Sequence, residues 1–387
     1  MYKKIKLPFP KLLGALLLAC LACVEPLDEI FLGETPIIIV DARFTNIAEE
    51  NYVRLSKSEN NGRSSVIYRS ISNATVKLVI DNTTEVLLTE TEDGLYSFPQ
   101  DILCEVGKTY KIDILTPDGT QIYSVDENVT ESSVPIKKSY AIYEKDQLTQ
   151  GTVKYDGHEV YLDFEDPANQ ENYYMWDWTY YEKQYYCYTC TGQYYFRDER
   201  SGDAGECRDD NRARRGRVYD YSCEKDCWEI IRNNDVYIQN DEFSNGLEVK
   251  AKNIASIPLY STNGALVDIK QHSINKKAYA FLKLVKSQGQ DTGGLADTPP
   301  ATLSGNLYST NAQQPLAGYF MLSQASQDLF WLDRSDILQS VNILGLFNPS
   351  RRPSPEPSGL DTTRPPLAPC NNSSKRTSIR PTGWLSL

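Results

Sequence analysis

The chain has 387 residues, a formal net charge of −12 and 40% hydrophobic residues, so it is long enough for two domains with ordinary cores. The excess of acidic residues makes the chain a poor general binder of nucleic acid, because such binding depends on Lys and Arg side chains that neutralise phosphates. Tyr is abundant (26 residues), and Tyr, Val, Ile and Thr occur in short runs separated by Asn, Asp and Gly. This composition predicts a mainly β protein.

The start of the chain has the pattern of a lipoprotein export signal. Four lysines precede an apolar run at 12–22, which is shorter than the roughly 20 residues that a membrane-spanning helix needs. Cys20 and Cys23 both follow a small residue, and we favour Cys23 as the lipid-modified (palmitate-bearing) cysteine because Val24-Glu25-Pro26 begins a polar tether. The expectation is a signal peptide at 1–22 and a tether at 23–35. The alternatives are lipidation of Cys20 and a plain secretory signal.

Residues 36–134 are expected to form an immunoglobulin-like β-sandwich. Roughly seven short strands over about 100 residues, separated by turn signals, are typical of such a domain. One turn is explicit, since Pro117 fixes its own φ and Gly119 permits a positive φ. The strands are predicted around 37–40, 52–55, 74–80, 85–88, 95–98, 110–114 and 121–125.

A second, larger β domain is expected over 135–348. Its most unusual stretch is 173–196, where 12 of 24 residues are aromatic. Alternate positions of a strand share one face, so one face would carry Tyr174, Trp176, Trp178 and Tyr180. We interpret this ladder as core packing, with a stacking platform for a sugar or another planar ligand as the alternative.

A cysteine-rich insertion is predicted at 187–228, containing Cys187, Cys190, Cys207, Cys223 and Cys227. The C-x-x-C spacing is compatible with zinc, but cysteines of an exported protein usually form disulfides, so we favour disulfides and expect no metal. Cys104 and Cys370 are the remaining cysteines after residue 23. Seven cysteines leave at least one thiol without an intramolecular partner, and the connectivity is not readable from the spacing.

A single amphipathic helix is predicted at 273–288, with Ser273 as its N-cap and an apolar stripe that includes Ala278 and Phe281. After it come further strand patterns and then seven prolines between residues 349 and 369. Proline cannot donate to a β-ladder, so the segment 349–387 is expected to be an extended or disordered tail.

No catalytic residues are predicted. His158 and His272 are the two histidines and belong to no metal-binding motif. The triplet Asp291-Thr292-Gly293 resembles half of an aspartic protease site, but no second copy exists and turn residues of this kind are common in loops. Glu165 and Asp166 are an acidic pair of the type that glycosidases use, although sequence spacing says nothing about their separation.

Several segments in order resemble an outer-membrane lipoprotein family catalogued as domain of unknown function 4249. The resemblance implies a surface- or periplasm-facing lipoprotein, often encoded beside a TonB-dependent receptor, without established catalytic residues. The family's C-terminus has two close cysteines followed by a Pro and a Trp. Cys370, Pro381 and Trp384 match it, whereas Cys370 has no second cysteine nearby. The resemblance rests on Cys23-Val24-Glu25-Pro26, Ile39-Val40-Asp41-Ala42, Val53-Arg54-Leu55-Ser56, the stretch 272–281, Gly293-Gly294-Leu295, Ser304-Gly305-Asn306-Leu307-Tyr308 and Leu316-Ala317-Gly318-Tyr319-Phe320.

The resulting hypothesis is a lipid-anchored accessory or ligand-binding protein of the outer membrane, facing the cell surface, with periplasmic orientation as the alternative. It would work with a TonB-dependent β-barrel receptor, bind an unidentified ligand and use no cofactor. Two other functions stay open, namely a surface glycoside- or peptide-processing enzyme and a structural adhesion module.

Overall fold

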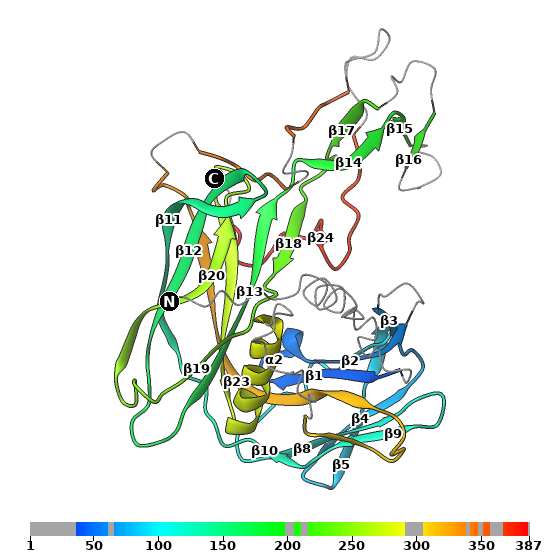
Figure 1. Cartoon of the computed structure of the whole chain (residues 1–387), viewed down its shortest axis with the longest axis vertical. Helices are drawn as coiled ribbons and strands as arrows, with labels where there is room; N and C mark the ends of the chain where they lie inside the picture. Colours follow the sequence, from blue (N-terminus) through cyan, green and yellow to red (C-terminus); the bar gives the residue numbers. More distant parts are fainter. Residues whose placement is uncertain are drawn as a thin grey trace, which may run out of the picture.

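The computed structural model describes residues 36–60, 66–197, 205–209, 216–290, 305–337, 341–346, 351–356 and 367–385. Its main feature is an 11-stranded central sheet that runs through the whole body of the molecule (Figure 1). Along the sheet the strands are β24 (Arg376–Thr377), β18 (Trp228–Arg232), β13 (Tyr173–Lys183), β21 (Ala265–Ile274), β23 (Leu316–Leu332), β1 (Ile38–Thr45), β2 (Tyr52–Asn60), β7 (Leu95–Ser97) and β6 (Thr89–Glu92), with β19 (Tyr237–Asn240) beside β13 and β3 (Val66–Ser70) beside β2.

Strand β23 joins the two halves of this sheet. Its first part pairs in parallel with β1, from Ile38 opposite Leu316 to Thr45 opposite Ser323. Its second part pairs antiparallel with β21, as far as Leu332 opposite Ala265. A strand of 17 residues is long enough to serve both partners in succession, so one backbone ladder connects the early and late parts of the chain.

A first flanking sheet covers one half of the central sheet. Its inward residues, including Leu78 and Ile112, pack against Val40, Phe44 and Phe320 in a single apolar core. This core forms because apolar residues alternate with polar ones along each strand and therefore share a face. The strands are β22 (Leu307–Ser309), β9 (Gln121–Ser124), β8 (Thr109–Leu115), β4 (Thr75–Ile80), β5 (Thr84–Leu87) and β10 (Glu127–Asn128).

A second flanking sheet covers the other half. It consists of β11 (Ile136–Gln150), β12 (Val153–Glu165) and β20 (Glu248–Pro258). Val160, Leu162 and Phe164 of this sheet pack against aromatic side chains of β13 and apolar side chains of β21. The mainly β class is confirmed, and in the part of the chain that the structure describes the two largest apolar cores lie side by side against the central sheet.

Both flanking sheets lie on the same face of the central sheet. Along β23, the even-numbered Phe320 packs in the first core and Leu332 in the second, whereas the odd-numbered Tyr319 and Met321 contact helix α2 (Lys276–Gln290) on the opposite face. Successive side chains of a strand alternate between faces, so this parity separates a core face from an opposite face, which we call the open face. The open face carries α2 and, over Trp331, the Trp384 ring.

The helix begins three residues later than expected. Ser273 was the predicted N-cap, but it belongs to β21, which pairs with strands on both sides. The cap is Asn275, whose side-chain Oδ1 accepts a hydrogen bond from the Ala278 N–H at 2.8 Å. The helical prediction was wrong at this end because the sheet ladder supplies more backbone hydrogen bonds than one additional helical turn.

The expected division at residue 134 does not separate the strands. Strand β22 pairs with β9, and the first part of β23 pairs with β1, so residues expected in the second domain complete the sheets of the first. Sequence order hides this because the paired residues are far apart in the chain, as are Leu307 and Ser124 or Leu316 and Ile38.

The cysteine-rich insertion forms an arm that projects from the top of the body in Figure 1. Its two small sheets pair β14 with β17 and β15 with β16. Two described parts of the proline-rich tail are held against this region, by the Arg351–Asp220 ion pair and by the Cys227–Cys370 disulfide. The expected disorder therefore does not apply to residues 351–356 and 367–385. The arm strands are β14 (Tyr186–Thr191), β15 (Tyr194–Phe196), β16 (Glu206–Arg208) and β17 (Val218–Ser222), and the remaining short element is the 3₁₀ turn η1 (Ala48–Glu50).

Candidate ligand-binding cleft

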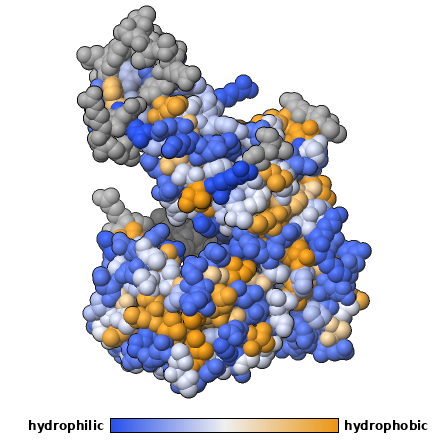
Figure 2. All heavy atoms as spheres, turned by 180° about the vertical axis from the view of Figure 1, so that it is seen from behind, coloured by the Kyte–Doolittle hydropathy of each residue, from blue (hydrophilic) through white to orange (hydrophobic). Residues whose placement is uncertain are grey.

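A cleft of about 950 Å³ lies on the open face of the central sheet. Its floor is formed by β13, β21, β23 and β1, and its walls come from η1, β2, the start of β19 and residues near the C-terminus. Seen from behind, the molecule has a hollow between its lower part and the upper part from which the arm projects (Figure 2). Pockets of roughly 300–1,000 Å³ are typical of small-molecule sites, so the cleft has the size of a ligand site.

The floor of the cleft carries a chain of ion pairs. The Arg43 guanidinium contacts the Asp177 carboxylate, and its Nη1 lies 3.4 Å from Glu50 Oε2. Lys270 Nζ lies 3.0 Å from Glu50 Oε1 and 2.7 Å from Asp268 Oδ2. These five side chains come from β1, η1, β13 and β21, so the network exists only when the two halves of the sheet are joined.

The sheet register explains why these charges meet. Asp177 lies directly opposite Lys270, and Thr179 lies opposite Asp268. Gln327 lies opposite Lys270 on the other side and donates from Nε2 to Asp268 Oδ1 at 2.8 Å. Directly opposed side chains on one face are close neighbours, so charged residues at alternate positions produce a continuous polar row.

The network shifts the pKa of its members. Burial alone would raise the pKa of Asp177, but its interactions with Arg43 above all, and with His272 and Lys270, outweigh burial and hold the pKa well below its usual value. Burial alone would lower the pKa of Lys270, but Glu50 and Asp268 raise it. Asp177 and Lys270 are therefore charged at neutral pH, and the floor presents fixed charges of both signs.

A Ser-His-Asp set lies beneath the floor. His272 Nδ1 lies 3.0 Å from Ser323 Oγ, and His272 Nε2 lies 3.4 Å from Asp177 Oδ2. Nucleophilic catalysis needs a hydroxyl that a substrate can reach. Ser323 is only 2% exposed and the His272 ring is fully buried, so this set has a structural role.

A sequence profile described as a domain of unknown function (DUF4249) matches residues 24–328. The chain belongs to this family. The matched region contains every residue of the ion-pair network and the greater part of both flanking sheets. No curated protein and no solved structure matches the chain.

In this DUF4249 chain, the predicted aromatic ladder lies on the core face of β13. Tyr174, Trp176 and Tyr180 are at most 1% exposed and Trp178 is 9% exposed. Phe164 of the second flanking sheet packs against Tyr174 and Trp176, so the rings are not available as a stacking platform. The strand does line the cleft, mainly through the alternate side chains and in addition through Trp176 and Trp178.

Strand β13 lines the cleft with Asp177, Thr179 and Tyr181, which the sequence interpretation missed, and also with Met175, Trp176 and Trp178. The sequence indicates a binding role for the first three residues only weakly, because Asp, Thr and Tyr at alternate positions between large aromatic residues are also typical of the solvent-facing side of a strand. The clue was Asp177, an isolated acid within an otherwise aromatic strand.

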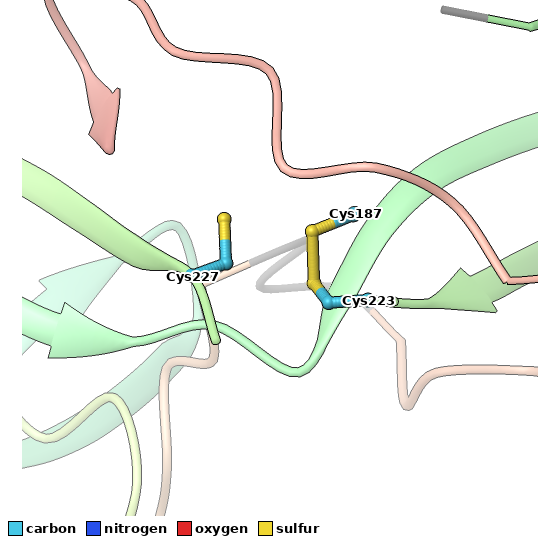
Figure 3. A group of neighbouring side chains, drawn as sticks. All are labelled: Cys187, Cys223 and Cys227. Atoms are coloured by element: carbon cyan, nitrogen blue, oxygen red, sulfur yellow. A yellow bond between two sulfur atoms is a disulfide. The ribbon is translucent and has the colours of Figure 1, made fainter. Parts of the chain in front are cut away.

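All five predicted cysteines of the arm are in disulfides. Cys187 pairs with Cys223, Cys190 with Cys207, and Cys227 with Cys370 of the tail. Cys187, Cys223 and Cys227 lie close together, with sulfur atoms within 4.8 Å of one another, and Figure 3 shows the Cys187–Cys223 bond beside Cys227. The family pattern places a second cysteine close to Cys370, and this chain has none there. In the fold, Cys370 pairs instead with Cys227, which is 143 residues away in sequence.

Cys104 is the free thiol of the described residues. It is buried in the first core, and burial is the main cause that raises its pKa to about 12. A neutral buried thiol is a poor nucleophile.

The tail borders the cleft through a segment that we name the C-terminal strap (residues 367–385). Ser374, Pro381 and Thr382 of the strap line the cleft wall. The strap is held by the Cys227–Cys370 disulfide, by β24 paired with β18, and by the Trp384 ring, which packs edge-on against Trp228 and Trp331. Upstream, Arg351 forms a bidentate ion pair with Asp220 of the arm, at 2.5 and 2.7 Å.

The acidic pair Glu165 and Asp166 does not form a site. Glu165 is exposed and pairs with Lys137, whereas Asp166 is buried and accepts a hydrogen bond from Tyr174. The signal peptide, the tether, Cys20, Cys23 and the triplet at 291–293 lie outside the described residues. None of the helices that the structure describes has the length and apolar character that crossing a membrane requires.

Proposed function

We propose that this protein is a lipid-anchored outer-membrane protein that captures a ligand in the cleft and works with a TonB-dependent receptor. The observation that carries the capture function is the cleft itself, an open space of about 950 Å³ over a floor of buried and half-buried ion pairs. A charged side chain on a protein surface is usually surrounded by water and free to move. The charged side chains of the cleft floor are instead held in place by ion-pair partners from four elements, and such pre-organisation favours ligand binding.

The location and the receptor rest on the sequence. The signal pattern before Cys23 and the acidic residues that follow support a lipoprotein exposed at the cell surface. A protein anchored by its N-terminus can present a cleft close to a membrane receptor, and tethering raises the effective concentration of captured ligand at that receptor.

Lipid anchoring is tested by labelling cells with an alkyne analogue of palmitate. We expect label on the wild-type chain and on Cys20→Ala, and none on Cys23→Ala. Label lost from Cys20→Ala but kept in Cys23→Ala would move the anchor to Cys20. Absence of label from all three would contradict the lipoprotein proposal.

The partner is tested by affinity purification of the full chain from detergent-solubilised outer membranes of the native host. We expect a β-barrel receptor to co-purify in near-stoichiometric amount. The Cys23→Ala variant serves as the control for anchoring. A chain that is repeatedly recovered without any receptor would contradict the partnership while leaving ligand capture open to a separate binding assay.

A further inference from the structure

The charges around the cleft argue against an anionic ligand. Among the described residues of the rim, the exposed charged side chains are four carboxylates and two arginines, Arg54 and Arg232. The two cations of the floor, Arg43 and Lys270, are already ion-paired. A phosphate, sulfate or carboxylate would therefore meet a net negative field and compete with existing partners. The rim carboxylates are Asp41, Glu49, Glu92 and Asp235.

The strand pairing argues against an extended peptide that binds through its backbone. Such a peptide adds a strand to an exposed sheet edge. The cleft lies over the face of the sheet, where β21 is paired with β13 along one edge and with β23 along the other. Strand β23 is paired with β1 up to Ser323 and with β21 from Ser323 onwards, so each part of it has one strand partner. A ligand that lies over this face meets the side chains that project from it.

These side chains suit a ligand rich in hydroxyl groups. The carboxylates of Asp177 and Asp268 are already held by Arg43, Lys270 and Gln327. The groups that can bind a ligand are the Thr179 and Tyr181 hydroxyls, which both donate and accept, and the second N–H and the oxygen of the Gln327 amide. A sugar hydroxyl is both a donor and an acceptor, so a row of alternating donors and acceptors can satisfy several of them. Tyr181 is half-buried on the floor and adds an aromatic face of the kind that apolar sugar faces contact.

We propose that the cleft binds a short neutral oligosaccharide, one without carboxylate, sulfate or phosphate groups. This inference rests on the proposed capture function and names its ligand class. Tyr181, Gln327 and Thr179 are the floor residues that contact the sugar, and the C-terminal strap forms one wall of the site.

The test is isothermal titration calorimetry of the full-length protein in detergent. The probes are neutral hexasaccharides of glucose, mannose and xylose, an oligogalacturonate as the acidic counterpart, and a hexalysine peptide. We expect binding of at least one neutral probe and at least tenfold weaker binding of the oligogalacturonate. Tyr181→Ala and Gln327→Ala should each lower the affinity for the neutral probe by at least tenfold.

Two further variants distinguish loss of the binding site from loss of the folded structure. Tyr308→Ala removes an exposed tyrosine on the first flanking sheet and should leave binding unchanged. Thr179→Trp fills the cleft without removing any ion pair and should abolish binding while the circular dichroism spectrum and thermal midpoint stay as in the wild type.

Three results would overturn the oligosaccharide proposal: no neutral probe binds, only the oligogalacturonate or hexalysine binds, or a neutral probe binds with equal affinity to Thr179→Trp. If hexalysine binds and Thr179→Trp abolishes that binding, the proposal that the cleft captures a ligand stands. The ligand class then changes from a neutral sugar to a cation. Receptor co-purification is measured independently, so its failure is distinguishable from failure of the sugar assay.

Discussion

Arg43 and Asp177 form an ion pair between strands that are 134 residues apart in sequence, one in each half of the central sheet. Each side chain is only 16% exposed. The contact joins β1 to β13 across the floor of the cleft and brings Glu50, Lys270 and Asp268 into one network. The pair therefore matters for both the stability of the shared sheet and the shape of the cleft.

Breaking this pair should destabilise the protein substantially. Arg43→Ala leaves the Asp177 carboxylate without its main cation, and Asp177→Ala does the reverse. We expect a loss of about 3 kcal/mol in the free energy of unfolding for each variant, since a buried charge without its partner is costly. Urea unfolding followed by tryptophan fluorescence measures this loss.

The matched control is Glu85→Gln in the exposed Lys77–Glu85 pair, which should leave the urea midpoint unchanged because exposed pairs are screened by water. Equal, small effects in all three variants would show that Arg43 and Asp177 are effectively solvated.

The stability should depend on pH through Asp177. Its pKa in the folded protein lies below the value of about 3.9 for an unfolded chain, so its stabilisation is fully present above about pH 4 and is lost as the pH falls through the folded pKa. We expect the stability gap between the wild type and Asp177→Asn to be constant from pH 7 to 5 and to narrow towards pH 2.5. Urea titrations at each pH measure the gap. A gap that widens on acidification would reverse the assigned sign.

The Cys227–Cys370 disulfide should stabilise the fold more than the Cys190–Cys207 disulfide within the arm. The chain-entropy relation gives about 5 kcal/mol for a separation of 143 residues and about 3 kcal/mol for the 17 residues between Cys190 and Cys207. The test compares the double serine variant at 227 and 370 with that at 190 and 207, because a single change would leave a thiol free to exchange with neighbouring disulfides.

We expect the first variant to show the larger drop in thermal midpoint and faster proteolysis within the C-terminal strap. Equal thermal midpoints and an unchanged cleavage pattern in the strap would show that β24 and Trp384 hold it without the disulfide.

Gly318 should be the most sensitive glycine of the sheet junction. It lies opposite Val40 in the parallel ladder with φ of +124°, and a Cβ there would lie 1.9 Å from the Val40 carbonyl oxygen. We expect Gly318→Ala to cost more than about 3 kcal/mol, because backbone strain adds to a clash that cannot relax. Gly119→Ala has a positive φ but no atom within 4 Å of the added Cβ, and should cost about 1 kcal/mol. Chemical denaturation of both variants checks the difference.

The sequence by itself determined the local features of this protein. Alternation of apolar and polar residues identified strands such as Thr75–Ile80 and Thr109–Leu115, because a half-buried strand requires that pattern. The cysteine content of 187–227 indicated a stapled arm. The aromatic ladder of Tyr174, Trp176, Trp178 and Tyr180 was correctly interpreted as core, since large aromatic side chains contribute most when they are buried.

Only the tertiary structure decided where the cleft lies and what forms it. The partners of Asp177 come from β1, η1 and β21, and no local pattern specifies which distant strands pair. The same limit explains why Cys370 and the strap were taken for a loose tail, and why β23 was assigned to one domain although it completes both cores. Pairing between distant strands follows from burial of the whole sheet, and that is a property of the complete chain.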